Sequence, residues 1–388
     1  MKKAKIYLIS LTILCCVTSC VSIENKETAC IPPLTNFAYF TGQATPYPDT
    51  SVAPPAPWVS EAVVELDYPV LLGVRVLPTK KENEFWIWDA DLWSPDQNSH
   101  QQLFIFRTDE AGLKPVLLDD ALVEFVFPLE KLFIAPDNSV WVVQQTSKYS
   151  EVPILGKYDD VTGRILPVVK LGEIQHHLDY QTIVLMDENT GVFWFLVPYG
   201  FIYSYDPASN TLVQHISIED KHPTGAAMTP DGNIYIYLLR HGSPTEQQDA
   251  LYLYSPRNES VEYITIGLEV DFYNKDLFVD HAGRLWLGSF GWREMDGKWY
   301  QTLRSPLFVL PSVEAGGERL YHWVPPSVRF ETPNDFFWFT SSQGGTYSLD
   351  FRKGEWCWVS TSSYLQKDSD GNLWLMVGQQ LFRLSETP

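Results

Sequence analysis

Short apolar runs recur along the chain, and each follows a turn rich in Asp, Asn and Gly. Seven such runs start at Glu84, Ser139, Gly191, Asn233, Arg284, Phe336 and Asn372. In the segments FIFRTD, IYSYDP and LYLYSP, which follow some of these runs, aromatic or aliphatic residues alternate with a period of two, which is typical of one face of a sheet. The seven runs recur at a mean spacing of about 48 residues, the length of one four-stranded propeller blade. The pattern predicts an all-β fold, a seven-bladed β-propeller of four-stranded blades.

One large aromatic residue stands near the start of each run. We call this set the anchor aromatics: Trp86, Trp141, Trp194, Tyr235, Trp286, Trp338 and Trp374. Sheets packed around an axis bury flat side chains between neighbouring blades, and burial of one such side chain is worth about 1.5 to 3 kcal/mol. We therefore expect the anchor aromatics to form the core and not a ligand-binding stripe.

The last repeat is one strand short. After its third strand the sequence reaches Pro388, whereas the strand-like segment Val59 to Leu66 precedes the first repeat and has no blade of its own. Pairing the two would remove open strand edges and close the ring. We predict a propeller domain over residues 59–388, with its last blade closed by this N-terminal strand.

The N-terminus has the form of a secretion signal. Three Lys precede an apolar stretch from Ile6 to Val17 that is short for a membrane span. The following VTSC resembles a bacterial lipobox, which implies a signal peptide over 1–19 and a lipid on Cys20. The alternative is an ordinary signal peptide with Cys20 as a bystander. Residues 20–58 are rich in Pro and predict an extended tether. Val21 follows the Cys. In a Gram-negative cell an Asp at this position would resemble the inner-membrane retention signal, so its absence leaves an outer-membrane location open.

The net charge limits the kinds of molecule that the chain can bind, and the cysteine content limits the disulfides that it can form. Loss of Lys2, Lys3 and Lys5 with the signal takes the net charge from −20 to −23, which disfavours nucleic acid as a partner. Outside the signal and the lipobox only Cys30 and Cys357 remain. They could form a disulfide in an oxidising compartment. The alternative, a small buried Cys357, is favoured because sequence fixes no distance between the two.

The pieces DHAGRLWLGSF from Asp280 and DSDGNLWLMVG from Asp368 resemble the repeat of two-component regulator propellers. A similar repeat belongs to the virginiamycin B lyase family, which uses a His, an acid and a metal ion on one propeller face. The catalytic motif of that family does not fall on any His of this chain. The resemblance therefore implies packing and not activity.

Candidate functional residues come from loops that a propeller would gather on one rim. His177, Asp179 and His222, with His176, Asp220 and Asp271 nearby, could hold a divalent metal or move protons. Solvated loop side chains are the alternative. A second set of candidates offers rings for stacking sugars or peptides, with loop packing as the alternative: Trp93, Tyr199, Phe290 and Trp292.

The sequence lacks a Walker-type loop, a GxSxG elbow, HExxH and CxxC. We therefore favour a non-enzymatic binding or scaffolding lipoprotein, monomeric and tethered outside a bacterial membrane, with no cofactor and a protein, peptide or glycan as its ligand. A propeller lyase or hydrolase that uses rim His and carboxylate residues is one alternative. An extracytoplasmic sensor module is the other.

Overall fold

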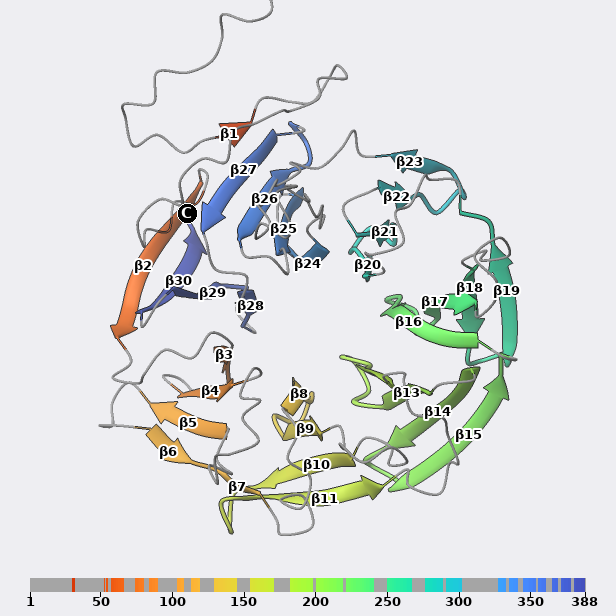
Figure 1. Ribbon diagram of the computed structural model, residues 1–388, viewed down its shortest axis with the longest axis horizontal. Coiled ribbons are helices and arrows are strands. Elements are labelled where there is room, and N and C mark those ends of the chain that lie inside the picture. Colours follow the sequence, from red (N-terminus) through yellow and green to blue (C-terminus); the bar gives the residue numbers. More distant parts are fainter. Residues whose placement is uncertain are drawn as a thin grey trace, which may run out of the picture.

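A computed structural model shows the strands arranged as sheets around a common axis (Figure 1). It describes residues 30–31, 52, 54, 57–65, 74–79, 84–89, 103–107, 113–118, 129–144, 154–170, 182–197, 200–218, 221–240, 250–266, 276–288, 291–301, 327–332, 335–340, 345–353, 355–360, 365–368, 371–377 and 380–387. Within these ranges the strands form seven sheets. The chain is an all-β propeller built from four-stranded blades. No helix in the described ranges is long and apolar enough to span a membrane.

The first three sheets follow the chain from its N-terminal half. One contains β3 (Val74–Pro78), β4 (Glu84–Asp89), β5 (Leu103–Arg107) and β6 (Leu113–Pro115). The next contains β8 (Leu129–Ile134), β9 (Val140–Gln144), β10 (Ile154–Asp159) and β11 (Arg164–Lys170), with β7 (Leu117–Leu118) added in parallel to β11. The third contains β12 (Ile183–Met186), β13 (Phe193–Val197), β14 (Phe201–Asp206) and β15 (Thr211–Ser217).

Three further sheets continue around the ring. They contain β16 (Lys221–Met228), β17 (Ile234–Arg240), β18 (Ala250–Ser255) and β19 (Ser260–Ile264); then β20 (Leu277–Val279), β21 (Leu285–Leu287), β22 (Gly291–Arg293) and β23 (Trp299–Gln301). The third of them contains β24 (Ser327–Thr332), β25 (Phe336–Thr340), β26 (Thr346–Asp350) and β27 (Glu355–Ser360), with β1 (Cys30–Ile31) at its edge.

The last sheet joins the two ends of the propeller. It contains β28 (Leu365–Lys367), β29 (Leu373–Val377), β30 (Gln380–Glu386) and the N-terminal strand β2 (Trp58–Glu65). β2 runs antiparallel to β30, from Trp58 opposite Glu386 to Glu65 opposite Gln380. The prediction that the segment from Val59 completes the last blade is confirmed. The physical reason is the one expected from the sequence, because the pairing covers the outer edge of β30.

The anchor aromatics form the boundaries between blades. All seven are buried, with at most 8% of their surface exposed. Trp141 packs on Phe193 of the following blade at 5.1 Å between ring centroids, and Trp286 packs on Phe337 at 4.6 Å. Trp374 meets Phe85 of the β3–β6 blade at 4.8 Å, so the last blade packs on the first. The prediction that these residues are core is confirmed.

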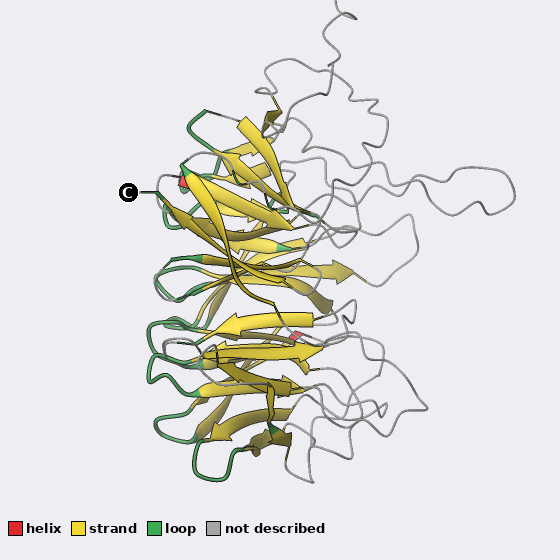
Figure 2. Cartoon of the chain, turned by 90° about the vertical axis from the view of Figure 1, so that its left-hand side faces the viewer, coloured by secondary structure: helices red, strands yellow, loops and turns green. Residues whose placement is uncertain are grey.

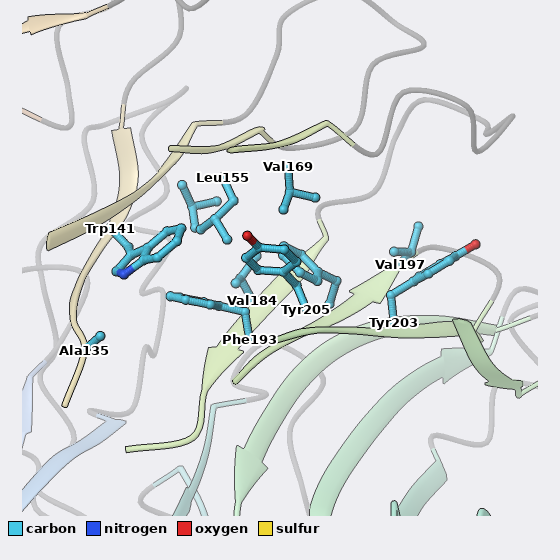
Figure 3. Close-up of a cluster of buried hydrophobic side chains, with 11 residues drawn as sticks. Ala135, Trp141, Leu155, Val169, Val184, Phe193, Val197, Tyr203 and Tyr205 are labelled. Atoms are coloured by element: carbon cyan, nitrogen blue, oxygen red, sulfur yellow. The ribbon is translucent and has the colours of Figure 1, made fainter. Parts of the chain in front are cut away.

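Figure 3 shows one such boundary, between the β8–β11 and β12–β15 blades. Trp141 and Leu155 come from one blade and Phe193 and Tyr205 from the other, and all four are buried. The aromatic rings meet edge to face or tilted, the arrangement that the ring quadrupole favours. Each blade therefore buries one face on its predecessor and the other on its successor.

In two of the repeats the turn before the anchor is built around a hydrogen-bonded Asp. Asp280 is fully buried and accepts bonds from the backbone N–H of Arg284 at 2.8 Å, its Nε at 2.6 Å, and Trp286 Nε1 at 2.9 Å. Asp368 accepts the backbone N–H and the side-chain amide of Asn372, and Trp374 Nε1 at 2.8 Å. The Asp of the repeat thus closes the turn and also satisfies the indole N–H of the buried anchor.

Cys357 differs from the favoured expectation. It is buried, as expected, but it is disulfide-bonded and not a free thiol. Cys30 lies directly opposite it in the β1–β27 pairing. The interpretation of Cys357 as a lone small hydrophobe is therefore wrong. The sequence left this open because two cysteines more than 300 positions apart carry no local signal of their distance.

The two Asp turns give a matched test of this arrangement. We expect Asp280→Ala to lower the free energy of unfolding by about 3 to 5 kcal/mol, because the largely buried Arg284 guanidinium loses its counter-charge. Asp368→Ala should cost about 1 to 3 kcal/mol, since its lost partners are neutral. Urea denaturation at neutral pH measures both variants. Equal costs would show that the Asp280–Arg284 pair adds nothing to the turn.

Candidate functional site

Most of the predicted rim residues lie outside the described residues. This holds for Trp93, Tyr199 and Phe290, for His177 and Asp179, and for their neighbours His176, Asp220 and Asp271. The backbone of His222 belongs to β16, opposite Leu239 of β17. The predicted metal and ligand sets therefore stay predictions, and so does the lipid site at Cys20, which also lies outside the described ranges.

Trp292 is the one aromatic candidate in the described part of the chain. It lies within strand β22 and not in the preceding loop, where the sequence had suggested it. Its ring stacks on Tyr300 at 5.4 Å and contacts Trp286 at 5.1 Å, while Nε1 donates to Glu294 Oε1 at 2.8 Å. The ring also meets Phe351 of the following blade at 5.1 Å. These contacts describe a half-buried packing residue, because its polar atom and its ring are both engaged within the fold.

The described turns gather on one side of the ring (Figure 2). On this side a cluster of ionisable groups joins two neighbouring blades. His281, in the β20–β21 turn, donates its backbone N–H to Glu331 Oε2 at 2.7 Å, and its Nδ1 hydrogen-bonds Oε1 of the same carboxylate. Because a carboxylate only accepts, Nδ1 carries the proton. The Glu331 side chain is 7% exposed and the His281 ring 69%.

Asp335 completes a set of three potential metal ligands. Ligand atoms of His281, Glu331 and Asp335 all lie within 4.8 Å of one another, a donor set that would suit a divalent transition metal. However, Arg352 Nε donates to Asp335 Oδ2 at 2.7 Å, and both Glu331 oxygens are occupied by His281. A cation would have to displace these contacts and lie beside a guanidinium. The arrangement fits a hydrogen-bonded clamp between blades better than a metal site.

This clamp was not predicted from the sequence, although the register of the repeats contains a signal for it. His281 follows Asp280, and Glu331 precedes Thr332, which bonds the anchor Trp338 as Asp280 bonds Trp286. Aligning the repeats would have placed the two residues on adjacent turns. That they point toward each other could not be read from the alignment.

A second cluster lies between the β12–β15 and β16–β19 blades. The His215 ring packs on Trp194 at 5.0 Å, and its Nε2 is 2.8 Å from Ser204 Oγ. Tyr254 is fully buried beside it, and within the described residues its hydroxyl and His215 Nδ1 have no hydrogen-bond partner. Burial, with a further contribution from the Glu259 carboxylate, raises the pKa of Tyr254 to about 12. Such a hydroxyl stays protonated at neutral pH and cannot act as a base there.

Comparison with known proteins supports the fold. No family model matches the chain, and no curated protein matches it in sequence. Among solved structures, a streptogramin B lyase superimposes with a TM-score of 0.53 at 11% identity, covering 85% of this chain and 98% of the lyase. At this identity the likeness shows a shared β-propeller fold and carries no activity.

Two bacterial surface proteins are also similar. The extracellular domain of the putative hybrid two-component system BT3049 from B. thetaiotaomicron has a TM-score of 0.53 at 15% identity, over 86% of this chain and 42% of that one. PorZ, a surface component of the type-IX secretion system of Porphyromonas gingivalis, has a TM-score of 0.50 at 13% identity, over 82% and 46%. The chain spans less than half the length of both. These three neighbours thus support the β-propeller fold that the repeats predicted.

The hydroxyl of Tyr254, which has no hydrogen-bond partner among the described residues, predicts an unusual response to substitution. Tyr254→Phe should leave the free energy of unfolding at pH 7 unchanged or raise it slightly, because it removes a buried polar atom without a partner. Tyr205→Phe is the matched control: its hydroxyl donates to Asn210 Oδ1 at 2.9 Å, so its loss should cost about 0.5 to 1.5 kcal/mol.

The Tyr254→Phe variant also tests the raised pKa of Tyr254. In the wild type Tyr254 ionises near pH 10 when unfolded and near 12 when folded. Its contribution to stability is therefore complete below pH 10 and is lost as the pH rises through 12. Tyr254→Phe should lose less stability than wild type between pH 7 and pH 11 in urea titrations. A cost at pH 7 equal to that of Tyr205→Phe would show that the hydroxyl has a partner.

Proposed function

We propose that the chain is an extracytoplasmic β-propeller, tethered to a bacterial membrane through Cys20, that serves as a binding or scaffolding module. The disulfide at Cys357 carries this proposal, because structural disulfides form and persist in oxidising compartments outside the cytoplasm. It agrees with the signal-like N-terminus and the lipobox-like VTSC. The similarity in fold to the extracellular domain of BT3049 is consistent with this location.

We infer further that the seven sheets are the seven blades of one closed ring. The contact of Trp374 with Phe85 and the pairing of β2 with β30 support this inference, since they join the last blade to the first. A closed ring has no free blade face and is therefore a rigid support for loops. Rigidity suits a module whose ligand is a protein, peptide or glycan, because little ordering entropy is lost on binding.

Binding is favoured over catalysis because the ionisable groups on the side of the ring where the described turns gather are already hydrogen-bonded or ion-paired. There the carboxylates of Glu331, Asp335 and Asp280 all face cations or N–H donors that belong to the fold. A catalytic group needs a free atom directed at a substrate. A lyase or hydrolase that uses His177, Asp179 and His222 remains the second proposal, and a sensor module the third, both resting on the rim loops.

The location has a direct test with a matched control. We expect the full chain, expressed in a Gram-negative host with a palmitate analogue, to carry label and to sediment with membranes. Cys20→Ala should abolish the label, whereas Cys16→Ala, inside the predicted signal, should retain it. Label on Cys20→Ala, or an unlabelled wild type in the soluble fraction, would contradict a lipid anchor at Cys20.

A second experiment, on the soluble domain without the lipid anchor, separates binding from catalysis. The soluble domain, used as bait on the envelope fraction, should recover a protein or glycan and contain no stoichiometric metal by elemental analysis. Stoichiometric metal that is lost in His222→Ala would instead favour the enzyme proposal.

A further inference from the structure

The disulfide at Cys357 lies where the predicted tether meets the ring. β1 pairs antiparallel with β27, with Cys30 opposite Cys357 and Ile31 opposite Trp356. Directly opposed residues in such a pair have Cα atoms about 4.5 to 5.5 Å apart, within the range that a disulfide spans. Cys15 and Cys16 precede the predicted cleavage site, and the Cys20 thiol would carry the lipid. Cys30 is therefore the partner that fits both the pairing and the chain.

We propose that the Cys30–Cys357 bond makes the outer edge of the β24–β27 blade the side of the ring that faces the membrane. This inference rests on the proposed anchor at Cys20. From Cys20 to Cys30 the chain can extend by at most about 35 Å, at about 3.3 to 3.6 Å per residue. Over the whole predicted tether, from Cys20 to Trp58, the limit would be about 130 Å. The bond thus shortens the reach of the anchor roughly fourfold.

The rest of the tether takes a different role. Residues 32–57 run between two strands that both belong to the ring, β1 on the β24–β27 blade and β2 on the last blade. Because both ends of this loop in the chain belong to the ring, its length would not change the distance from the lipid to the ring. The Pro-rich pieces TPYPDT and VAPPAP both lie within this loop and not in the segment between lipid and ring.

A short anchor on one blade also orients the ring. Figure 1 places β14 and β15 across the ring from β27. The β12–β15 blade is then the side farthest from the lipid. Its outer strand is open to solvent, with Leu212 43% and Val213 42% exposed. The β12–β15 edge is therefore the one most accessible to a partner approaching from outside.

Insertions test the shortened reach without disturbing the fold. A flexible Gly/Ser insertion of about 20 residues adds about 25 Å of root-mean-square length. One variant carries it after Asn25, between lipid and disulfide, and the control carries it after Gly42, inside the loop. A fluorescent amino acid at Met295, a 77% exposed position in the β22–β23 turn, reports energy transfer to an acceptor lipid in vesicles.

We expect the Asn25 insertion to lower the transfer efficiency at least twofold and the Gly42 insertion to leave it unchanged. In a Cys30→Ser/Cys357→Ser background both insertions should lower it alike. The same fluorophore at Val161, 92% exposed in the β10–β11 turn, should show weaker transfer than at Met295. Equal effects of the two insertions in the disulfide-bonded chain, or equal transfer at the two positions, would overturn the inference.

Failure of the proposed lipid anchor and failure of the inference about the disulfide give different results. A chain that carries no lipid at Cys20 would not be recovered on vesicles, which overturns both proposals. A lipidated chain in which the two insertions act alike overturns this inference alone. Peptide mapping without reductant should recover Cys30 and Cys357 in one linked pair of peptides. Recovery of Cys357 linked to any other cysteine overturns the inference whatever the vesicles show.

Discussion

The packing of an aromatic side chain from each blade on the next blade is the interaction on which this structure depends. A single sheet of four short strands has two apolar faces and cannot bury both alone. The anchor aromatics solve this by placing a large ring at every boundary, with Trp86, Trp286 and Trp338 almost wholly buried. Such a chain of contacts is stable only if its two ends also meet. The contact of Trp374 with Phe85 joins the last blade to the first. The strand β2 completes that last blade, since it pairs with β30 while Trp58 packs on Trp338 of the preceding blade at 5.0 Å.

The sequence predicted those features that repeat. The anchor positions follow from a regular spacing, and the role of β2 followed from a blade that lacked a strand. Features that depend on distances between side chains were missed. Asp280 stands in one of the turns that mark the repeats, but its bond to the indole of Trp286 was not foreseen. The favoured interpretation of Cys357 was wrong for the same reason. The rim candidates, His177 and Trp93 among them, lie outside the described residues and stay predictions.

The ionisable groups on the turn side serve the fold. Glu331 binds His281 of the preceding blade, and Lys367 Nζ of the following blade lies 3.5 Å from the Glu331 carbonyl oxygen. One residue thus links three consecutive blades. Arg284 adds a cation–π contact across the same boundary, 4.4 Å from the Phe351 ring. Polar contacts and aromatic packing therefore act at the same junctions between blades.

Closure of the ring by the N-terminal strand is the central claim, and hydrogen exchange of β2 tests it most directly. Strands that belong to one cooperative unit open together and show the same protection. The amides of β2 that bond to β30 should exchange as slowly as those between β29 and β30, and both sets should lose protection at the same denaturant concentration. Fast exchange of Trp58 to Glu65 while β30 stays protected would contradict a ring closed by this strand.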